Sequence, residues 1–114
     1  MAGILSERTV GATTVLKPLG RIDSQSSPAF EAAIGEKLNS TQRLVLDFAD
    51  VPYISSAGLR VVLVTAKQVA RAQGKFALAS MRPEVMELFK VSGLSSILKI
   101  FDTPEAASAA LESA

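Results

Sequence analysis

The sequence of 114 residues contains no cysteine and no histidine. A chain without cysteine forms no disulfide and offers neither a thiolate nucleophile nor a zinc–thiolate site. A chain without histidine lacks the usual general base near neutral pH and the commonest metal ligand, and it has no Ser-His-Asp triad. Catalysis would have to rest on carboxylates, lysines and hydroxyls alone, so we expect neither an enzyme nor a cofactor.

The sequence also has no large excess of positive or negative charge and no long apolar run. The 12 Lys and Arg residues nearly balance the 11 Asp and Glu residues, which gives no broad attraction to nucleic acid or to an anionic membrane. No apolar run approaches the roughly 20 residues that span a bilayer, and the first residues lack the basic and apolar regions of a signal peptide. We therefore expect a cytoplasmic protein with no nucleic-acid partner and no direct membrane insertion.

The residues that are present indicate one folded α/β domain. Apolar residues make up 48% of the chain and charged residues 20%, the balance of a globular protein. Strand patterns occur in five stretches, the first two around a turn at Gly11: residues 4–8, 13–19, 43–48, 75–80 and 97–101. Helical spacing of apolar residues lies between the later strands and after the last one. This alternation predicts a mixed sheet of about five strands covered by about four helices.

The sequence also predicts where helices begin, which side they bury and where one ends. Ser27 followed by Pro28 is typical of an N-cap with proline at the first helical position. Gly93 is placed to end the third helix. The second helix is expected to face the core with six residues at helical spacing: Leu59, Val62, Leu63, Ala66, Val69 and Ala70.

The stretch DVPYISSAGL, residues 50–59, places two serines and a glycine at the start of that second helix. A serine here either caps the helix with its oxygen or projects as an accessible hydroxyl, and one cap needs only one side chain. Gly58 costs about 1 kcal/mol relative to alanine in a helix, which indicates close approach of another backbone. Asp47 and Asp50 flank the stretch as a possible divalent-ion or acid–base pair, but without further acidic residues there we interpret them as capping and turn residues.

Three segments together resemble the STAS domain of bacterial anti-sigma factor antagonists, also called anti-anti-sigma factors. DFADVPYISSAGLRVVL is similar to the family's signature at the second helix. LGRIDSQSSPAFEAAI resembles its entry into the first helix, and VMELFKVSGLSSILKIFDTPEAASAAL its closing helix, last strand and tail helix. The resemblance implies a single STAS domain over residues 1–114.

The same resemblance implies a switch controlled by phosphorylation. In that family the unphosphorylated antagonist binds a serine-kinase anti-sigma factor that uses ATP, and so releases a sigma factor. Phosphorylation by the kinase switches the antagonist off, and a PP2C-type phosphatase acts on the phosphorylated form. The phosphoacceptor serine matches Ser56, with Gly58 and Leu59 aligned behind it. The family's preceding aspartate is Ser55 here, which makes Ser55 a second choice of acceptor, and the following hydroxyl residue is Ala57.

The expected partner-binding surface surrounds this serine. Asp23 matches an acidic residue of the family and is expected near the loop, while Arg60, Lys67 and Arg71 fall on one side of the second helix, as a solvated face or as an edge for acidic groups of the kinase. Ala57, Val61 and Val64 are expected to form an outward apolar patch. The complete predicted set is Asp23, Ser55, Ser56, Ala57, Gly58, Leu59, Arg60, Val61 and Val64.

Two other functions remain open from the sequence. Similar STAS domains are small subunits of membrane lipid-transport ABC complexes, where they bind the ATPase without a phosphorylation cycle, and the changed residues Ser55 and Ala57 are compatible with that function. Enzymatic activity on a small ligand is the third hypothesis, and the absence of histidine and cysteine argues against it.

Overall fold

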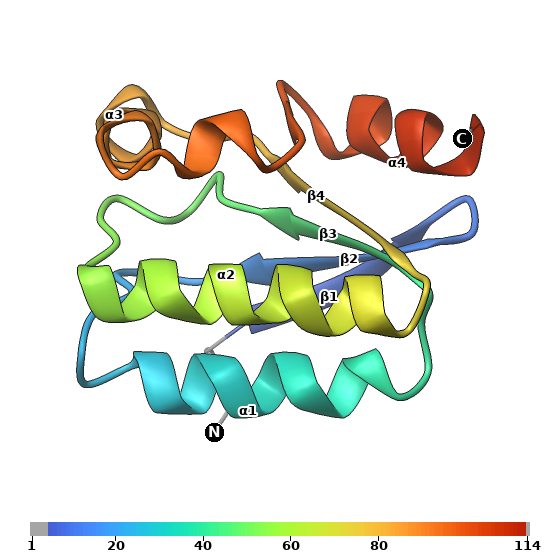
Figure 1. The fold of residues 1–114 in the computed structure, drawn as a ribbon, viewed down its shortest axis with the longest axis horizontal. Helices are drawn as coiled ribbons and strands as arrows, with labels where there is room; N and C mark the ends of the chain where they lie inside the picture. Colours follow the sequence, from blue (N-terminus) through green and yellow to red (C-terminus); the bar gives the residue numbers. More distant parts are fainter. Residues whose placement is uncertain (1–4, 114) are drawn as a thin grey trace.

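The computed structural model describes residues 5–113, which contain one five-stranded mixed sheet (Figure 1). The strands lie in the order in which they occur in the chain: β1 (Leu5–Val10), β2 (Thr13–Pro18), β3 (Arg43–Asp47), β4 (Lys75–Ala79) and β5 (Ile100–Phe101). β1 and β2 are antiparallel, and every later pair is parallel. The predicted hairpin with its turn at Gly11 is confirmed, although its predicted first residue, Ile4, lies outside the described residues.

Helices cover both faces of the sheet, as Figure 1 shows. α1 (Ser27–Leu38) and α2 (Ser56–Arg71) lie side by side on one face, and α4 (Pro104–Ser113) packs on the other. α3 (Pro83–Val91) and the short 3-10 helix η1 (Leu94–Ser96) follow β4. Their residues Val85, Phe89 and Leu94 pack into the hydrophobic core that lies under α1 and α2. The predicted fold class, a mixed sheet of five strands with four α-helices, is confirmed.

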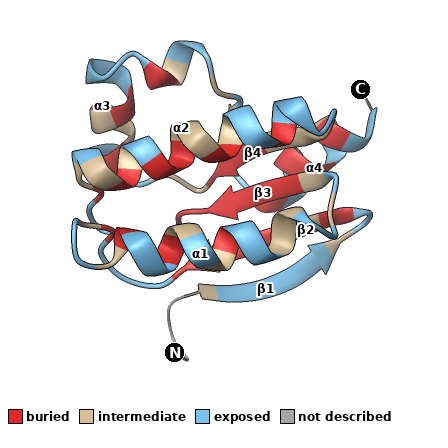
Figure 2. Cartoon of the chain, turned by 60° about the horizontal axis from the view of Figure 1, so that its bottom comes forward, coloured by how far each residue is buried: buried red, intermediate tan, exposed pale blue. Residues whose placement is uncertain are grey.

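The central strand β3 explains why two separate cores form. Leu44 and Leu46 belong to the larger core under α1 and α2, whereas Val45 belongs to the smaller core with Ala107 and Leu111 of α4. Successive side chains of a strand point to opposite faces, so a strand buried on both faces is apolar throughout. Figure 2 shows β3 buried and the exposed residues of α1 and α2 on their outer sides.

The last strand is shorter than predicted. The backbone N–H groups of Ile97 and Leu98 both donate to the carbonyl oxygen of Leu94, each at 3.1 Å, so these residues still follow the turn of η1. β5 therefore begins only at Ile100 and pairs with β4 over two residues. Gly93, with φ +83°, directly follows the C-cap of α3, which confirms its predicted place.

Two details predicted for the helices are wrong. The N-cap of α1 is Ser26 and not Ser27, since Ser27 is already the first helical residue, and the Ser26 hydroxyl bonds within the preceding loop instead of capping. On α2 the buried side is rotated from the predicted one. Ala70 is exposed, while Val61 and Thr65 are buried because α2 rests against both the sheet and α1. The Thr65 hydroxyl donates to the Val61 carbonyl at 2.8 Å, so burial leaves it satisfied.

Candidate functional site

Two loops pair with each other at the carboxyl ends of β2 and β3. They are the β2–α1 loop, residues 19–26, and the β3–α2 loop, residues 48–55. The backbone N–H of Ile22 donates a hydrogen bond to the backbone carbonyl of Tyr53 at 3.0 Å. The backbone N–H of Ser55 donates to the backbone carbonyl of Ile22 at 2.8 Å. The resulting bridge between Ile22 and Ile54 continues the parallel pairing of the two strands. It places Asp23 beside the start of α2, as the sequence predicted.

The two adjacent serines at the start of α2 have different roles. Ser55 has extended backbone angles, φ −88° and ψ 174°, and its Oγ accepts a hydrogen bond from the Gly58 N–H at 3.3 Å. Ser55 is therefore the N-cap. Ser56 is the first helical residue and is exposed, and in the described part of the chain its hydroxyl makes no hydrogen bond. One serine holds the helix start, and the other presents a free hydroxyl.

This division predicts unequal effects of alanine at the two positions. Ser55→Ala should lower the free energy of unfolding by about 1 kcal/mol, because the Gly58 N–H loses its acceptor. Ser56→Ala should change it by less than about 0.5 kcal/mol. Urea unfolding of the two variants measures both values, and equal losses would contradict the assignment of Ser55 as the cap.

Gly58 lies buried against the loop pair. A Cβ added to Gly58 would stand 2.6 Å from Cγ1 of Ile54 and 2.7 Å from Cγ2 of Ile22, closer than real Cβ atoms approach. The predicted close approach is therefore real, but it is made by two side chains and not by a backbone. The absence of a side chain at Gly58 allows the first turn of α2 to sit directly on the bridge between the loops.

Asp23 holds the β2–α1 loop in shape. Its Oδ1 accepts hydrogen bonds from the backbone N–H groups of Ser26 and Gln25, each at 3.1 Å. The bond from the Ser26 N–H, followed by those from Gln25 and the Ser26 hydroxyl and by the nearby Arg21 charge, holds the pKa of Asp23 below its ordinary value of 3.8. Binding to a partner stays a prediction for this residue.

The lowered pKa of Asp23 gives a pH dependence with a definite sign. Its ionised form stabilises the folded state, so this contribution is complete above about pH 4 and is lost as the pH falls through the folded-state pKa. Asp23→Asn should therefore destabilise the protein at pH 7, and the difference from the wild-type chain should shrink toward pH 2. Thermal unfolding of both proteins across this range measures it, and a difference that grows on acidification would contradict this role.

The outward face of α2 begins at Ser56 and continues with a basic ridge, which we define as Arg60, Lys67 and Arg71. Ser56 and all three ridge residues are exposed. Nη2 of Arg60 lies 3.7 Å from Oε1 of Glu31 on α1, a loose ion pair between exposed groups. The predicted surface thus has an accessible hydroxyl followed by positive charge along one helix.

The apolar part of the predicted partner surface needs a correction. Val61 has 0% exposure and belongs to the core, because α2 turns this position toward the sheet and α1. A partner that docks on the folded domain does not reach Val61, and the buried Gly58 is likewise covered. Ala57, Leu59 and Val64 are half-buried and remain at the edge of the surface.

Other charged groups at this edge of the sheet serve the loops. Asp47 Oδ1 accepts from the Ala49 N–H at 3.0 Å, in keeping with the predicted turn role, and Asp50 forms an ion pair with Lys17 at 3.3 Å. Within residues 5–113 no group of three or more acidic side chains could hold a metal ion. No helix in this range has the length and apolar character needed to cross a bilayer.

One contact at the site was not predicted from the sequence. The guanidinium of Arg21 lies 4.6 Å from the ring centroid of Tyr53, and both residues are exposed. The two residues stand on different loops and meet only because Ile22 pairs with Ile54. The signal available in the sequence was an isoleucine followed by a polar residue in each of the two loops.

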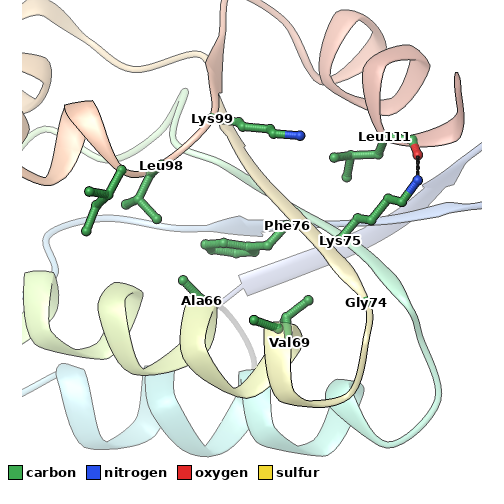
Figure 3. A pocket seen from close by; sticks show the side chains of 10 residues that line it. Ala66, Val69, Gly74, Lys75, Phe76, Leu98, Lys99 and Leu111 are labelled. Carbon is green, nitrogen blue, oxygen red and sulfur yellow. Dashed lines mark hydrogen bonds between the residues drawn. The ribbon is translucent and has the colours of Figure 1, made fainter. Parts of the chain in front are cut away.

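A hollow of about 250 Å³ lies away from this site, between the second half of α2, β4 and α4 (Figure 3). Ala66, Phe76, Lys99 and Leu111 are among its lining residues, and the Lys75 ammonium donates to the Leu111 carbonyl at 3.3 Å. None of the predicted site residues lines it. The candidate site around the start of α2 therefore lies outside this hollow.

Fold and site together define a small α/β domain with an accessible helix start and an exposed helix face. A family model described as STAS domain matches residues 5–107, and the chain belongs to this family. The resemblance read from the sequence is thereby confirmed.

Relatives and solved structures agree with this assignment. BtrV of Bordetella bronchiseptica, whose name places it among the anti-sigma factor antagonists, is 41% identical over 96 residues, 83% of each chain. The anti-sigma-B factor antagonist of Bacillus subtilis is 30% identical over 81 residues, 71% of this chain and 74% of that protein.

In fold, the crystal structure of tm1081 from Thermotoga maritima has a TM-score of 0.89 at 24% identity and covers 95% of this chain and 94% of that one. The Bacillus protein SpoIIAA has been solved both unphosphorylated, with a TM-score of 0.81 at 20% identity over 96% of this chain and 97% of that one, and phosphorylated.

Proposed function

We propose that this protein is a cytoplasmic anti-sigma factor antagonist that binds an anti-sigma factor through the start and outer face of α2. The names of its relatives support this function. The observation that carries it is the pair of adjacent serines, of which Ser55 is used as the N-cap while Ser56 stays exposed and unbonded at the head of the basic ridge. The bound anti-sigma factor would release its sigma factor or another target.

The regulation that we propose is phosphorylation of Ser56 by a partner that is itself a serine kinase. The Ser56 oxygen forms a bond to the γ-phosphorus of ATP as the bond to the ADP oxygen breaks, and the hydroxyl proton is released. Phosphoserine carries a charge of about −1.5 to −2 at pH 7. A PP2C-type phosphatase would hydrolyse this bond with water and restore the binding form.

Electrostatics favours a switch that changes binding and leaves the fold intact. The first turn of α2 contains no acidic residue, and the amino end of a helix offers unpaired N–H groups and the positive end of its dipole. The phosphate is therefore accommodated by the chain itself. In a close interface the same dianion must be desolvated against a partner that offers no matched cation, which is costly.

The replacement of the family's aspartate by Ser55 fits this proposal. Serine and aspartate are both good N-caps, so the exchange preserves the helix start. What the exchange removes is a carboxylate next to the phosphoacceptor, a change that concerns recognition by the kinase. Ser55 itself is half-buried and engaged with the Gly58 N–H, which makes it the poorer acceptor of phosphate.

Phosphate mapping after incubation with the cognate serine kinase and ATP tests the proposed site. We expect one phosphate per chain, located on Ser56 by fragmentation mass spectrometry. Ser56→Ala should abolish incorporation, whereas Ser55→Ala should retain it. Equal phosphate uptake by the Ser56→Ala protein would contradict the site.

The departures at Ser55 and Ala57 are also compatible with a second candidate function, that of a STAS subunit of a membrane lipid-transport ABC complex. Such a subunit binds the transporter ATPase and has no need for a phosphoacceptor. Copurification with an ATP-driven transporter, together with no phosphate uptake from any serine kinase encoded nearby, would favour this function over the first.

A further inference from the structure

We infer that a phosphate on Ser56 is held by Arg60 of the same helix, which gives up its ion pair with Glu31 to do so. The inference rests on the proposed modification of Ser56. It adds to that proposal a residue of this chain that recognises the phosphate. The switch then has two parts: negative charge appears at Ser56, and the first positive charge of the basic ridge is withdrawn from a partner.

The spacing of the two residues brings them together. Ser56 is the first residue of α2, and Arg60 follows four positions later, where helical side chains are neighbours about 5–6 Å apart at Cβ. Both side chains are exposed, and neither is covered by another element. The long arginine side chain can therefore turn toward the amino end of the helix without moving the backbone.

The present partner of Arg60 is a weak competitor. The 3.7 Å separation from Glu31 is longer than a hydrogen bond, and the side chains of Arg60 and Glu31 are 63% and 41% exposed. Exposed ion pairs of this kind contribute little. A phosphate offers nearly twice the charge of the carboxylate, and its oxygens match the two parallel N–H donors of a guanidinium.

The remaining charges around the site do not provide an equal alternative. On the β2–α1 loop, Arg21 is engaged with the Tyr53 ring and lies 3.7 Å from Asp23, whose carboxylate is bound to its own loop. Glu31 faces α2 from α1 and repels a phosphate. Lys67 stands about three turns beyond Ser56 on the same helix. Arg60 is therefore the nearest cation along α2 that can pair with the modified residue.

The test uses full-length protein with phosphoserine incorporated at position 56 during translation, so that no kinase is required. The pKa of the phosphate, ordinarily about 6, is followed by phosphorus NMR. In Arg60→Gln we expect this pKa to lie about 0.5 higher than in the otherwise unchanged phosphoprotein, because the cation that favours the dianion is gone. Arg60→Lys should give an intermediate value, since it keeps the charge and loses the paired donors.

Arg71→Gln is the matched control, with the same exchange on the same exposed face but at the far end of α2. It should leave the phosphate pKa unchanged. As a second readout, the Nε–H signal of Arg60 should move with the titration of the phosphate and remain fixed in the unmodified protein. Equal pKa values in Arg60→Gln and the unchanged phosphoprotein, or an Arg60 signal indifferent to the phosphate, would overturn the inference.

These outcomes are independent of the proposed function. Failure of a kinase to modify Ser56 would refute the proposed regulation and leave the measured Arg60–phosphate pair in place. Conversely, a kinase that modifies Ser56 in a protein where Arg60→Gln leaves the pKa unchanged would refute the pair alone.

Discussion

Gly58→Ala is expected to lower the free energy of unfolding by about 1 kcal/mol, although alanine is the better helix former. The new Cβ would stand 2.6 Å from Ile54 and 2.7 Å from Ile22, both of them buried. Relief requires that α2 move away from the bridge between the loops, and overpacking of this kind costs about 1–3 kcal/mol. The cost exceeds the gain of roughly 1 kcal/mol in helix propensity.

Gly35 provides a matched control for this prediction. It lies inside α1, is exposed, and a Cβ added there would meet nothing within 4 Å. Gly35→Ala should therefore stabilise the protein by about 0.5–1 kcal/mol. Urea unfolding of both variants gives the comparison, and two changes of the same sign would contradict the packing assigned to Gly58.

Ser56→Glu is expected to weaken binding of the proposed serine-kinase anti-sigma factor about tenfold or more, while Ser56→Gln weakens it much less. The two variants have nearly the same shape and differ by one negative charge. Because Ser56 is exposed, neither should unfold the domain. In a close interface the glutamate must lose water without gaining a cation from the partner, and each 1.4 kcal/mol of that cost is a factor of ten in affinity.

Isothermal titration of the two variants against the same kinase measures this difference, with thermal unfolding as the check on the fold. Glutamate carries one charge at a longer reach than phosphate, so its effect should be smaller than that of the authentic modification. Equal affinities of the Glu and Gln variants would show that negative charge at the start of α2 does not oppose docking.

The order of strands and helices could be predicted because each element is defined by local patterns. The strand patterns located all five strands, and Pro28 marked the start of α1 to within about one residue. Errors arose where tertiary packing decides. The buried side of α2 is rotated toward Val61 and Thr65 because the helix contacts the sheet and α1 together. The last strand lost Ile97 and Leu98 to the turn of η1.

The location of the candidate site could be predicted from a sequence motif, but the contacts between its residues could not. The SSAG stretch indicated a helix start with one capping and one spare serine, but the motif left open which serine does which. That depends on the bond from Ser55 to Ile22 across two loops, a contact between residues far apart in the sequence. The stack of Arg21 on Tyr53 and the packing of Gly58 follow from the same bridge.

The central claim is that a dianion on Ser56 blocks docking on α2 while the domain stays folded. The most direct measurement is the dissociation constant of the serine-kinase anti-sigma factor for the authentic Ser56 phosphoprotein and for the unmodified chain, taken together with the unfolding temperature of each. We predict an affinity loss of about a hundredfold, equal to roughly 2.7 kcal/mol, with little change in unfolding temperature. Equal affinity of both forms, or a loss of affinity that is accompanied by unfolding, would contradict the account.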